Sequence, residues 1–505
     1  MPVTLKDVNL HDYDSTNLLE LRKKLLTAPV EICIERAVRI TEYMKNNADV
    51  EETPQIFRAE AVAHYLSHKI PRFFDGDENL LAGSTGSKFK SALLFPEFIG
   101  LTIWSELDTI SKREKNPQLL SAAEAQTLNL DVFPYWLNRD VLSTAKRYIK
   151  EKKFSENIGN DKVPLKGNDE IPLKLLERLI FYLSGKGSCI SHTVPMFKRV
   201  LSEGLNAIIA EAREKAGKKN ESEEKNESKD FYTAVYTVLE GFLDYVNNLS
   251  KEARRHAEKA EKEGDGKAKK RFMRMAEACE NIPAKPASSF YEAVNCIWLC
   301  LTAIHAENMN MAISPGRLDQ VLYPYYKKDK DYDKLTDKEA ADIIGNLFLK
   351  LGDNVNLVPA VSEDLFGGAG TAPAVTVGGV DENEKDAVNE LTYIMLEVTK
   401  ILKLREPNVN ARYHSKVNST EYRDTVAKVI SETEAIPAFY NDIAIISTLE
   451  KQGVSTGDAR DYAIIGCVEY SVSGKSYDAS SDILLNLAAP LEMALYNGRR
   501  FKTGD

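Results

Sequence analysis

The residues best suited to chemistry lie in one stretch of the sequence, "RDYAIIGCVEYSVSGKSYDASSD", from Arg460 to Asp482. In it an apolar run and Gly466 precede Cys467, and Glu469 follows two residues later. The apolar run predicts a buried strand, and the glycine permits a tight turn at its end. A thiol and a carboxylate would therefore lie close together on one short loop at the end of a buried strand.

Composition indicates a large globular protein that is not built to bind polyanions. The chain has 505 residues, of which 43% are hydrophobic and 28% are charged. This balance excludes a disordered chain, and the length permits several cores or one large barrel. The formal net charge of -10 argues against nucleic acid or an anionic membrane surface as a partner.

No segment of the sequence reads as a membrane or export signal. The N-terminal residues have no basic region followed by an apolar one, so we expect a cytoplasmic protein. The most apolar stretch, residues 293–313, contains His305 and Glu307, which leaves too short an apolar span for a bilayer. A buried helix explains this stretch better.

The other candidate metal or redox residues are better explained as ordinary packing. Cys296 and Cys300 are one helical turn apart in the apolar stretch, with no third ligand at a metal-site spacing, and are predicted to be small core residues. His64 and His68 also lack a third ligand. The six cysteines are scattered through a chain without an export signal, so we expect neither disulfides nor a bound metal.

Hydrophobic periodicity divides the chain into two regions with different predicted secondary structure. Residues 15–47 and 55–70 have apolar side chains at helical spacing, and residues 1–170 are predicted to be mainly helical. From about Ser289 to the last residue, short β-type runs such as "PAVTVGGV", "PNVNARYH" and "AIPAFYND" alternate with helices. Strands that alternate with helices indicate an α/β sheet or barrel.

Several segments in order resemble the catalytic domain of glycyl radical enzymes of the pyruvate formate-lyase type. They are "SFYEAVNCIWLC", "ISPGRLDQVLYPYY", "VTVGGVDENEKDAVNELTYIMLE", "LKLREPNVNARYH" and "GDARDYAIIGCVE". The earlier segments "ENLLAGSTGSKFKSALLFPE" and "SHTVPMFKRVLSEGLNAI" also fit, so the resemblance covers nearly the whole chain.

The resemblance implies an α/β fold in which two half-barrels are surrounded by helices and enclose a cysteine loop. On this basis residues 1–505 are the N-terminal portion of the catalytic domain, with a helical region at 1–170 and a barrel region at 289–505. In the family, a glycine radical near the C-terminus takes hydrogen from the loop cysteine, whose thiyl radical then takes hydrogen from the substrate.

Carried onto this sequence, the resemblance implies that Cys467 is the thiyl residue. Gly-Cys-Val-Glu resembles the eliminases of the family, in which this glutamate, here Glu469, is the general base. The formate-lyase acyltransferases carry two adjacent cysteines on this loop, whereas Cys467 lies between Gly466 and Val468. Acyl transfer through a second thiol is therefore disfavoured.

Three further residues match family positions that contact substrate: His192, Ser314 and Asp482. Arg317 and Asp319 are expected to form structural ion pairs instead. The stretch "GKSYDASSD" departs from the "GKTxGWHDA" of glycerol and choline enzymes, so neither glycerol nor choline is implied as the substrate.

The resemblance also implies partners. The sequence contains no Arg-Val-Ser/Ala-Gly-Tyr motif, where the family places its radical glycine. We therefore expect the N-terminal part of a longer enzyme, inactive alone, which needs its C-terminal portion and forms a homodimer when complete. No cofactor is expected to bind directly, because a separate radical S-adenosylmethionine activase with an iron–sulfur cluster would install the glycine radical.

Three interpretations remain open. The first is an eliminase or dehydratase that acts on a small molecule. The second keeps the fold but cleaves a C–C bond, as in a decarboxylase or a formate C-acetyltransferase. The third is a non-catalytic scaffold. A cysteine hydrolase is disfavoured, because no histidine–aspartate pair follows Cys467 and His414 lies on a separate predicted strand.

Overall fold

The structure is a computed structural model of the 505-residue chain. It describes residues 2–74, 78–98, 100–141, 143–144, 192–218, 223–307, 309–360, 370–466, 468–476 and 488–497.

Four short strands form a first parallel sheet. They are β1 (Val30–Cys33), β2 (Ser91–Leu93), β3 (Gln118–Leu119) and β4 (Asn354–Val355). Their order in the sheet is β3-β1-β2-β4, so the last strand comes from a distant part of the chain. The residues of β2 and β4 are buried, as expected for strands covered on both faces.

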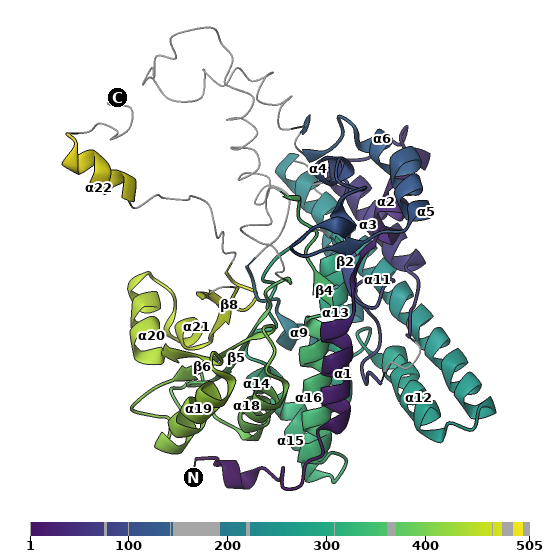
Figure 1. Ribbon diagram of the computed structural model, residues 1–505. Coiled ribbons are helices and arrows are strands. Elements are labelled where there is room, and N and C mark those ends of the chain that lie inside the picture. Colours follow the sequence, from purple (N-terminus) through teal and green to yellow (C-terminus); the bar gives the residue numbers. More distant parts are fainter. Residues whose placement is uncertain are drawn as a thin grey trace.

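A second parallel sheet is built from consecutive strand–helix units. Its strands are β5 (Ala374–Gly378), β6 (Asn408–Tyr413) and β7 (Ala438–Asn441), in the order β5-β6-β7. Helix α18 (Glu390–Leu402) connects β5 to β6, and α19 (Thr420–Thr433) connects β6 to β7. Parallel neighbours need such crossovers, and Figure 1 shows these helices beside the green strands.

Helices surround the two sheets. The first group comprises η1 (Leu5–Asp7), α1 (Thr16–Thr27), α2 (Glu35–Asn46), α3 (Pro54–His68), α4 (Gly100–Trp104), η2 (Ile110–Lys112), α5 (Ala122–Thr127), η3 (Leu128–Val132) and α6 (Phe133–Trp136). The second group comprises α9 (Phe197–Glu203), α10 (Leu205–Gly217), α11 (Glu223–Lys262), α12 (Gly266–Asn281), α13 (Phe290–Glu307), α14 (Leu318–Val321), α15 (Tyr323–Asp331) and α16 (Asp337–Leu351).

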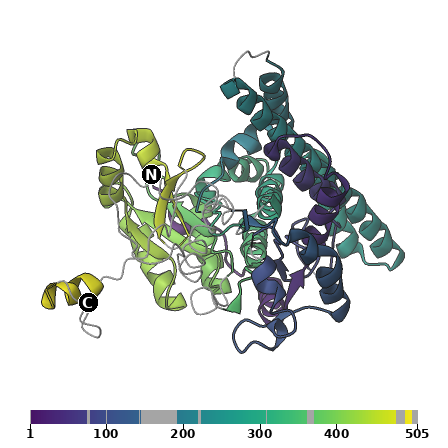
Figure 2. The ribbon, with the colours of Figure 1, turned by 90° about the horizontal axis from the view of Figure 1, so that it is seen from above.

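Beyond the second sheet the chain forms α20 (Asp442–Lys451) and α21 (Thr456–Arg460). A two-stranded hairpin of β8 (Tyr462–Ile465) and β9 (Glu469–Val472) comes next, followed by α22 (Ala488–Leu495). In both ribbon views α22 lies away from the two sheets (Figures 1 and 2), and Leu491 and Leu495 on it are exposed. The view from above shows the second sheet and its helices on one side and the N-terminal helices on the other (Figure 2).

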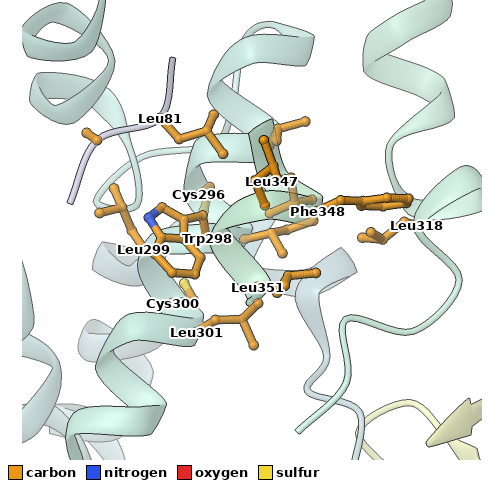
Figure 3. Close-up of a cluster of buried hydrophobic side chains, with 14 of the residues drawn as sticks. Leu81, Cys296, Trp298, Leu299, Cys300, Leu301, Leu318, Leu347, Phe348 and Leu351 are labelled. Carbon is orange, nitrogen blue, oxygen red and sulfur yellow. The ribbon is translucent and has the colours of Figure 1, made fainter. Parts of the chain in front are cut away.

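The central core lies between α13 and α16. Trp298 and Leu299 on α13 are buried against Leu347 and Phe348 on α16, and Cys296 and Cys300 fill spaces in the same cluster (Figure 3). Burial confirms that these two cysteines are core residues. None of the helices in the described ranges combines the length and apolar character needed to cross a membrane.

Local sequence signals explain where the helices begin. Thr336 caps α16 through a reciprocal hydrogen-bond pair with Glu339, and Asn389 caps α18 in the same way with Thr392. These pairs satisfy backbone groups that the first helical turn leaves unbonded.

The predicted runs at residues 373–380, 407–414 and 435–442 all contain strands, which confirms the α/β prediction. The region expected to be mainly helical also supplies β1, β2 and β3 to the first sheet. The strand β1 interrupts the helical pattern of residues 15–47 and separates α1 from α2.

Candidate active site

The candidate residues lie on an antiparallel hairpin. Strand β8 (Tyr462–Ile465) pairs with β9 (Glu469–Val472), with Ile465 opposite Glu469 and Ala463 opposite Ser471. Alternation along the strands places these four side chains on one face of the hairpin. The residues that connect the strands begin with Gly466, whose φ of 52° is left-handed. The predicted strand–glycine–turn arrangement is confirmed up to Gly466.

His192 lies beside Glu469. Its Nε2 atom is 3.8 Å from Oε1 of the carboxylate, and the side chains are 14% and 33% exposed, respectively. This distance is longer than a hydrogen bond, but both groups can contact one polar substrate group, and the carboxylate still reaches solvent. Glu469 also accepts a hydrogen bond from the Val468 amide at 3.1 Å.

Left-handed backbone conformations gather at this point. His192, Ala312 and Ala372 have φ angles of 52°, 59° and 49°, although none of them is glycine. The His192 amide donates to the Met311 carbonyl at 3.0 Å, and the Ala312 amide donates to the Thr371 carbonyl at 2.6 Å. Such conformations are costly and cluster at functional sites, because the surrounding structure must hold them in place.

Gly466 packs closely against this cluster. A Cβ atom at Gly466 would lie 2.6 Å from Cδ2 of His192 and 3.0 Å from Cβ of Ala312. Any side chain at this position would push the hairpin away from the histidine. The glycine is therefore required by the close approach as well as by its left-handed φ.

Ser314 is fully buried and bridges two chain segments. Its hydroxyl donates to the Ala312 carbonyl at 3.1 Å and accepts from the Ala374 amide at 3.0 Å. Its own amide donates to the Thr193 carbonyl at 3.0 Å. Ser314 thus ties the start of β5 to the segments around His192 and Ala312.

Two of the expected site residues, Cys467 and Asp482, lie outside the described residues. The structure brings together His192, Glu469 and the segment of Ser314. Within the described ranges, no group of three or more His, Cys, Asp or Glu side chains is arranged to hold a metal ion.

Tyr440 on β7 is a further residue near the site that its sequence context does not mark. Its hydroxyl is buried and has no hydrogen-bond partner among the described residues. Burial and, to a smaller extent, the negative charge of Glu469 raise the pKa of Tyr440. The run "AIPAFYND" predicted the strand but carried no signal for this environment.

Arg317 and Asp319 belong to the supporting structure. Arg317 forms the expected ion pair, with Asp461 at 2.9 Å. Asp319 differs from the expectation, because its carboxylate accepts hydrogen bonds from the Gly378 amide and the Thr392 hydroxyl, each at 2.7 Å. Burial raises the pKa of Asp319, and a backbone amide with a hydroxyl satisfies this oxygen without a paired cation.

The fold and the site together define an α/β chain with two parallel sheets, the second of which packs against a hairpin that holds a carboxylate beside a histidine. The family model for pyruvate formate lyase-like proteins matches residues 12–505, and the chain belongs to this family.

Curated relatives include lyases and dehydratases. The isethionate sulfite-lyase of Oleidesulfovibrio alaskensis is 30% identical over 483 residues, which cover 94% of this chain and 55% of that protein. The (2S)-3-sulfopropanediol dehydratase of Klebsiella oxytoca is 27% identical over 495 residues, which cover 96% of this chain and 56% of that protein.

Solved structures of a glycyl radical enzyme and a related dehydratase have the same fold as this chain. The glycerol-bound B12-independent glycerol dehydratase from Clostridium butyricum has a TM-score of 0.83 and 30% identity, with 97% of this chain and 58% of that chain covered. A glycyl radical enzyme from Archaeoglobus fulgidus has a TM-score of 0.81 and 30% identity, with 96% and 59% covered. The fold is the glycyl radical enzyme barrel that the sequence predicted. The chain spans a little more than half of the length of these proteins.

Proposed function

We propose that this chain carries the substrate-activating half of a glycyl radical lyase of the eliminase type. Cys467 is the residue that takes a hydrogen atom from a carbon of a small polar substrate, and Glu469 is the general base. The natural protein acts with a radical S-adenosylmethionine activase, and a glycine radical supplies the oxidising equivalent that converts the Cys467 thiol to a thiyl radical.

One observation carries this proposal: the Glu469 carboxylate, at the start of β9, lies 3.8 Å from the His192 imidazole. A base must be within reach of the proton that it removes, and the position of Glu469 two residues after Cys467 in the sequence supports this role. The Gly-Cys-Val-Glu order resembles that of the family's eliminases, and curated relatives of this chain include lyases and dehydratases.

In the proposed reaction, Cys467 transfers a hydrogen atom and Glu469 transfers a proton. The sulfur of Cys467 takes one hydrogen atom from a substrate carbon, and Glu469 takes the proton of the hydroxyl on that carbon. The leaving group departs from the adjacent carbon with the bonding electron pair. The Cys467 thiol then returns its hydrogen atom to the product, which restores the thiyl radical.

His192 and Ser314 are proposed to line the substrate pocket with Asp482. His192 is 14% exposed and can donate a hydrogen bond to a substrate hydroxyl or to the departing group. Ser314 is already bonded to two backbone groups, so its contribution is to hold the wall of the pocket.

Product analysis tests the proposed reaction class. The natural protein that carries this sequence is activated anaerobically and offered vicinal diols, amino alcohols, hydroxysulfonates and arylacetates. Loss of water, amine or sulfite with formation of a carbonyl compound supports the eliminase. Decarboxylation or acyl transfer would instead assign the protein to the C–C lyases. If the glycine radical signal forms but none of these substrates is turned over, the result would count against both the eliminase and the C–C lyase.

A further inference from the structure

Strand β6 carries an unusual row of polar residues. Asn408, Asn410 and Arg412 alternate along it and so project from one face, and Asn410 and Arg412 are fully buried. The neighbouring residue Thr376 of β5, opposite Asn410, is also fully buried. Strands of parallel sheets are usually apolar, and buried polar side chains need partners.

Three of these side chains, those of Arg412, Thr376 and Asn408, bond to backbone groups along one edge of β8 and at its end. Arg412 Nη1 donates to the Tyr462 carbonyl at 2.8 Å, and the Ile464 amide donates to Thr376 Oγ1 at 2.8 Å. The third bond runs from Asn408 Nδ2 to the Gly466 carbonyl at 3.4 Å. Residues 462 and 464 alternate along β8, so their backbone groups point to the same side of the strand, and the Gly466 carbonyl follows directly after the strand.

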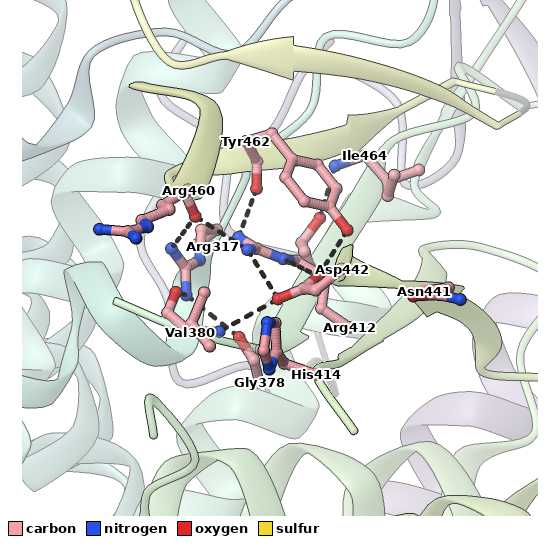
Figure 4. A network of polar contacts seen from close by, with 12 residues as sticks. Arg317, Gly378, Val380, Arg412, His414, Asn441, Asp442, Arg460, Tyr462 and Ile464 are labelled. Carbon is pink, nitrogen blue, oxygen red and sulfur yellow. Dashed lines mark hydrogen bonds and ion pairs between the residues drawn. The ribbon is translucent and has the colours of Figure 1, made fainter. Parts of the chain in front are cut away.

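Arg412 is the most firmly held of these side chains. Its Nε and Nη2 atoms each donate to the Asp442 carboxylate at 2.9 Å, and the Tyr462 hydroxyl donates to the same carboxylate at 2.6 Å. Arg412 Nη2 also donates to the Arg460 carbonyl at 2.8 Å, where Arg317 Nη1 adds a second bond at 3.3 Å. Figure 4 shows both guanidinium groups converging on the residues that precede β8.

We infer that Arg412, Thr376 and Asn408, the β8 anchor residues, are positioning residues that set the register of the hairpin and so the face on which Glu469 lies. Within the described ranges β8 pairs only with β9, and a two-stranded hairpin is marginally stable by itself. Polar side chains of the second sheet thus replace the missing strand neighbour on its open edge.

Register matters here because side chains alternate between the two faces. Ala463 and Ile465 pack with Val194 on the face of Glu469, while Tyr462 and Ile464 pack with the cluster around Ile446 on the opposite face. A slip of one residue would move Glu469 to the other face, away from His192. The anchor residues fix alternate backbone groups, and such a slip would leave all three bonds unmade.

The effect of the anchor residues on catalysis rests on the proposed role of Glu469 as the base, whereas their effect on the hairpin does not. The placement of the hairpin is measured without turnover, so a failure of this inference is distinguishable from a failure of the proposed function.

The sharpest experiment compares Thr376→Val with Thr376→Ser in the natural protein. Valine keeps the shape of threonine and removes only the hydroxyl, whereas serine keeps the hydroxyl. We expect amide hydrogen exchange in the peptide that covers β8 to become about tenfold faster in Thr376→Val, because the Ile464 amide loses its buried partner. Thr376→Ser should exchange like the unchanged protein.

A second readout follows the histidine. The ring resonance of His192, observed by selective histidine labelling, is first calibrated with Glu469→Gln, which removes the neighbouring charge. We expect Arg412→Lys, which keeps the charge but cannot make all four bonds, to shift the resonance toward the Glu469→Gln position.

Arg36→Lys is the matched control. Arg36 is also fully buried, pairs with Glu97, and donates to the backbone carbonyls of Ala306 and Glu307, far along the sequence from the hairpin. We expect it to lower stability without shifting the His192 resonance. The inference is overturned if Thr376→Val and Thr376→Ser exchange alike at β8, or if Arg36→Lys shifts the resonance as much as Arg412→Lys.

Discussion

Glu469 Oε1 lies 3.8 Å from His192 Nε2, although the two residues are far apart in the sequence. The segment after His192 makes this proximity possible, because Val194 packs beside Ala463 and Ile465 of the hairpin, and the Gly474 amide donates to the Val194 carbonyl at 2.8 Å. The histidine and the hairpin therefore form one packed unit, and a substitution that moves one of them should also displace the other.

Gly466→Ala tests this close approach. Both Gly466 and Gly453 have left-handed φ angles, of 52° and 89°, but a Cβ at Gly453 would meet nothing within 4 Å. Alanine at Gly453 should cost about 1 kcal/mol of unfolding free energy from the backbone alone. At Gly466 the clash with His192 should add about 1–3 kcal/mol, measured by urea denaturation. Equal costs at the two sites would contradict the described packing.

Asp442→Asn tests the buried charge pair. Burial alone would raise the pKa of Asp442, but Arg412 and the Tyr462 hydroxyl hold the pKa below its usual value of 3.8. A lowered carboxyl pKa contributes stability above pH 3.8 that is lost as the pH falls below it. Asp442→Asn should lower the free energy of unfolding by about 3–5 kcal/mol at pH 7, because Arg412 stays buried without a charge partner. The substitution should also remove this dependence of stability on acid pH.

Asp458→Asn is the control for that measurement. Asp458 pairs with Lys475 at the surface, where side chains are 30% and 56% exposed, so the substitution should cost less than about 1 kcal/mol. Similar losses for Asp442→Asn and Asp458→Asn would show that the Arg412–Asp442 pair is not the structural anchor described above.

His305 should make the protein acid-sensitive. Burial lowers the pKa of His305 to about 4, from 6.5 in the unfolded chain. Stability is therefore full above pH 6.5 and declines as the pH falls from 6.5 to 4, by up to about 3 kcal/mol, because only the unfolded state takes up the proton. His305→Gln should flatten this decline in pH-dependent denaturation, whereas the exposed His11→Gln should leave it unchanged.

Much of the architecture could be predicted from the sequence, because the strands at Ala374–Gly378 and Asn408–Tyr413 are bounded by helices with clear apolar periodicity. The first sheet could not, since its strands have only two to four residues and β1 lies inside a helical pattern. Glu469 was found from its spacing to Cys467 and from the family resemblance.

The supporting residues of the site were harder to predict. Nothing in the residue types of Ala312 or Ala372 indicates a left-handed backbone, because only tertiary contacts hold it there. Arg412 and Asn408 lie in a run that reads as an ordinary strand, and the role of their polar side chains becomes clear only when the carbonyl groups of Tyr462 and Gly466 are seen beside them.

Tyr440 and Tyr462 provide a matched test of hydrogen bonding on the hairpin side of the sheet. The Tyr440 hydroxyl has no hydrogen-bond partner among the described residues, so Tyr440→Phe should change the free energy of unfolding by less than about 0.5 kcal/mol relative to the unchanged protein. The Tyr462 hydroxyl donates to Asp442 at 2.6 Å, and Tyr462→Phe should cost about 1.5–3 kcal/mol. A reversed order in denaturation experiments would show that Tyr440 has the stronger partner.

The most direct test of the proposed function is the comparison of Glu469→Gln with Cys467→Ser in the natural protein after anaerobic activation. Electron paramagnetic resonance measures the glycine radical, and product formation is followed in the same samples. We expect Glu469→Gln to retain the radical but to turn over about 10² to 10⁴ times more slowly, and Cys467→Ser to form no product, because a serine O–H bond is too strong for the relay. Full turnover by Glu469→Gln, or any turnover by Cys467→Ser, would contradict the proposed function.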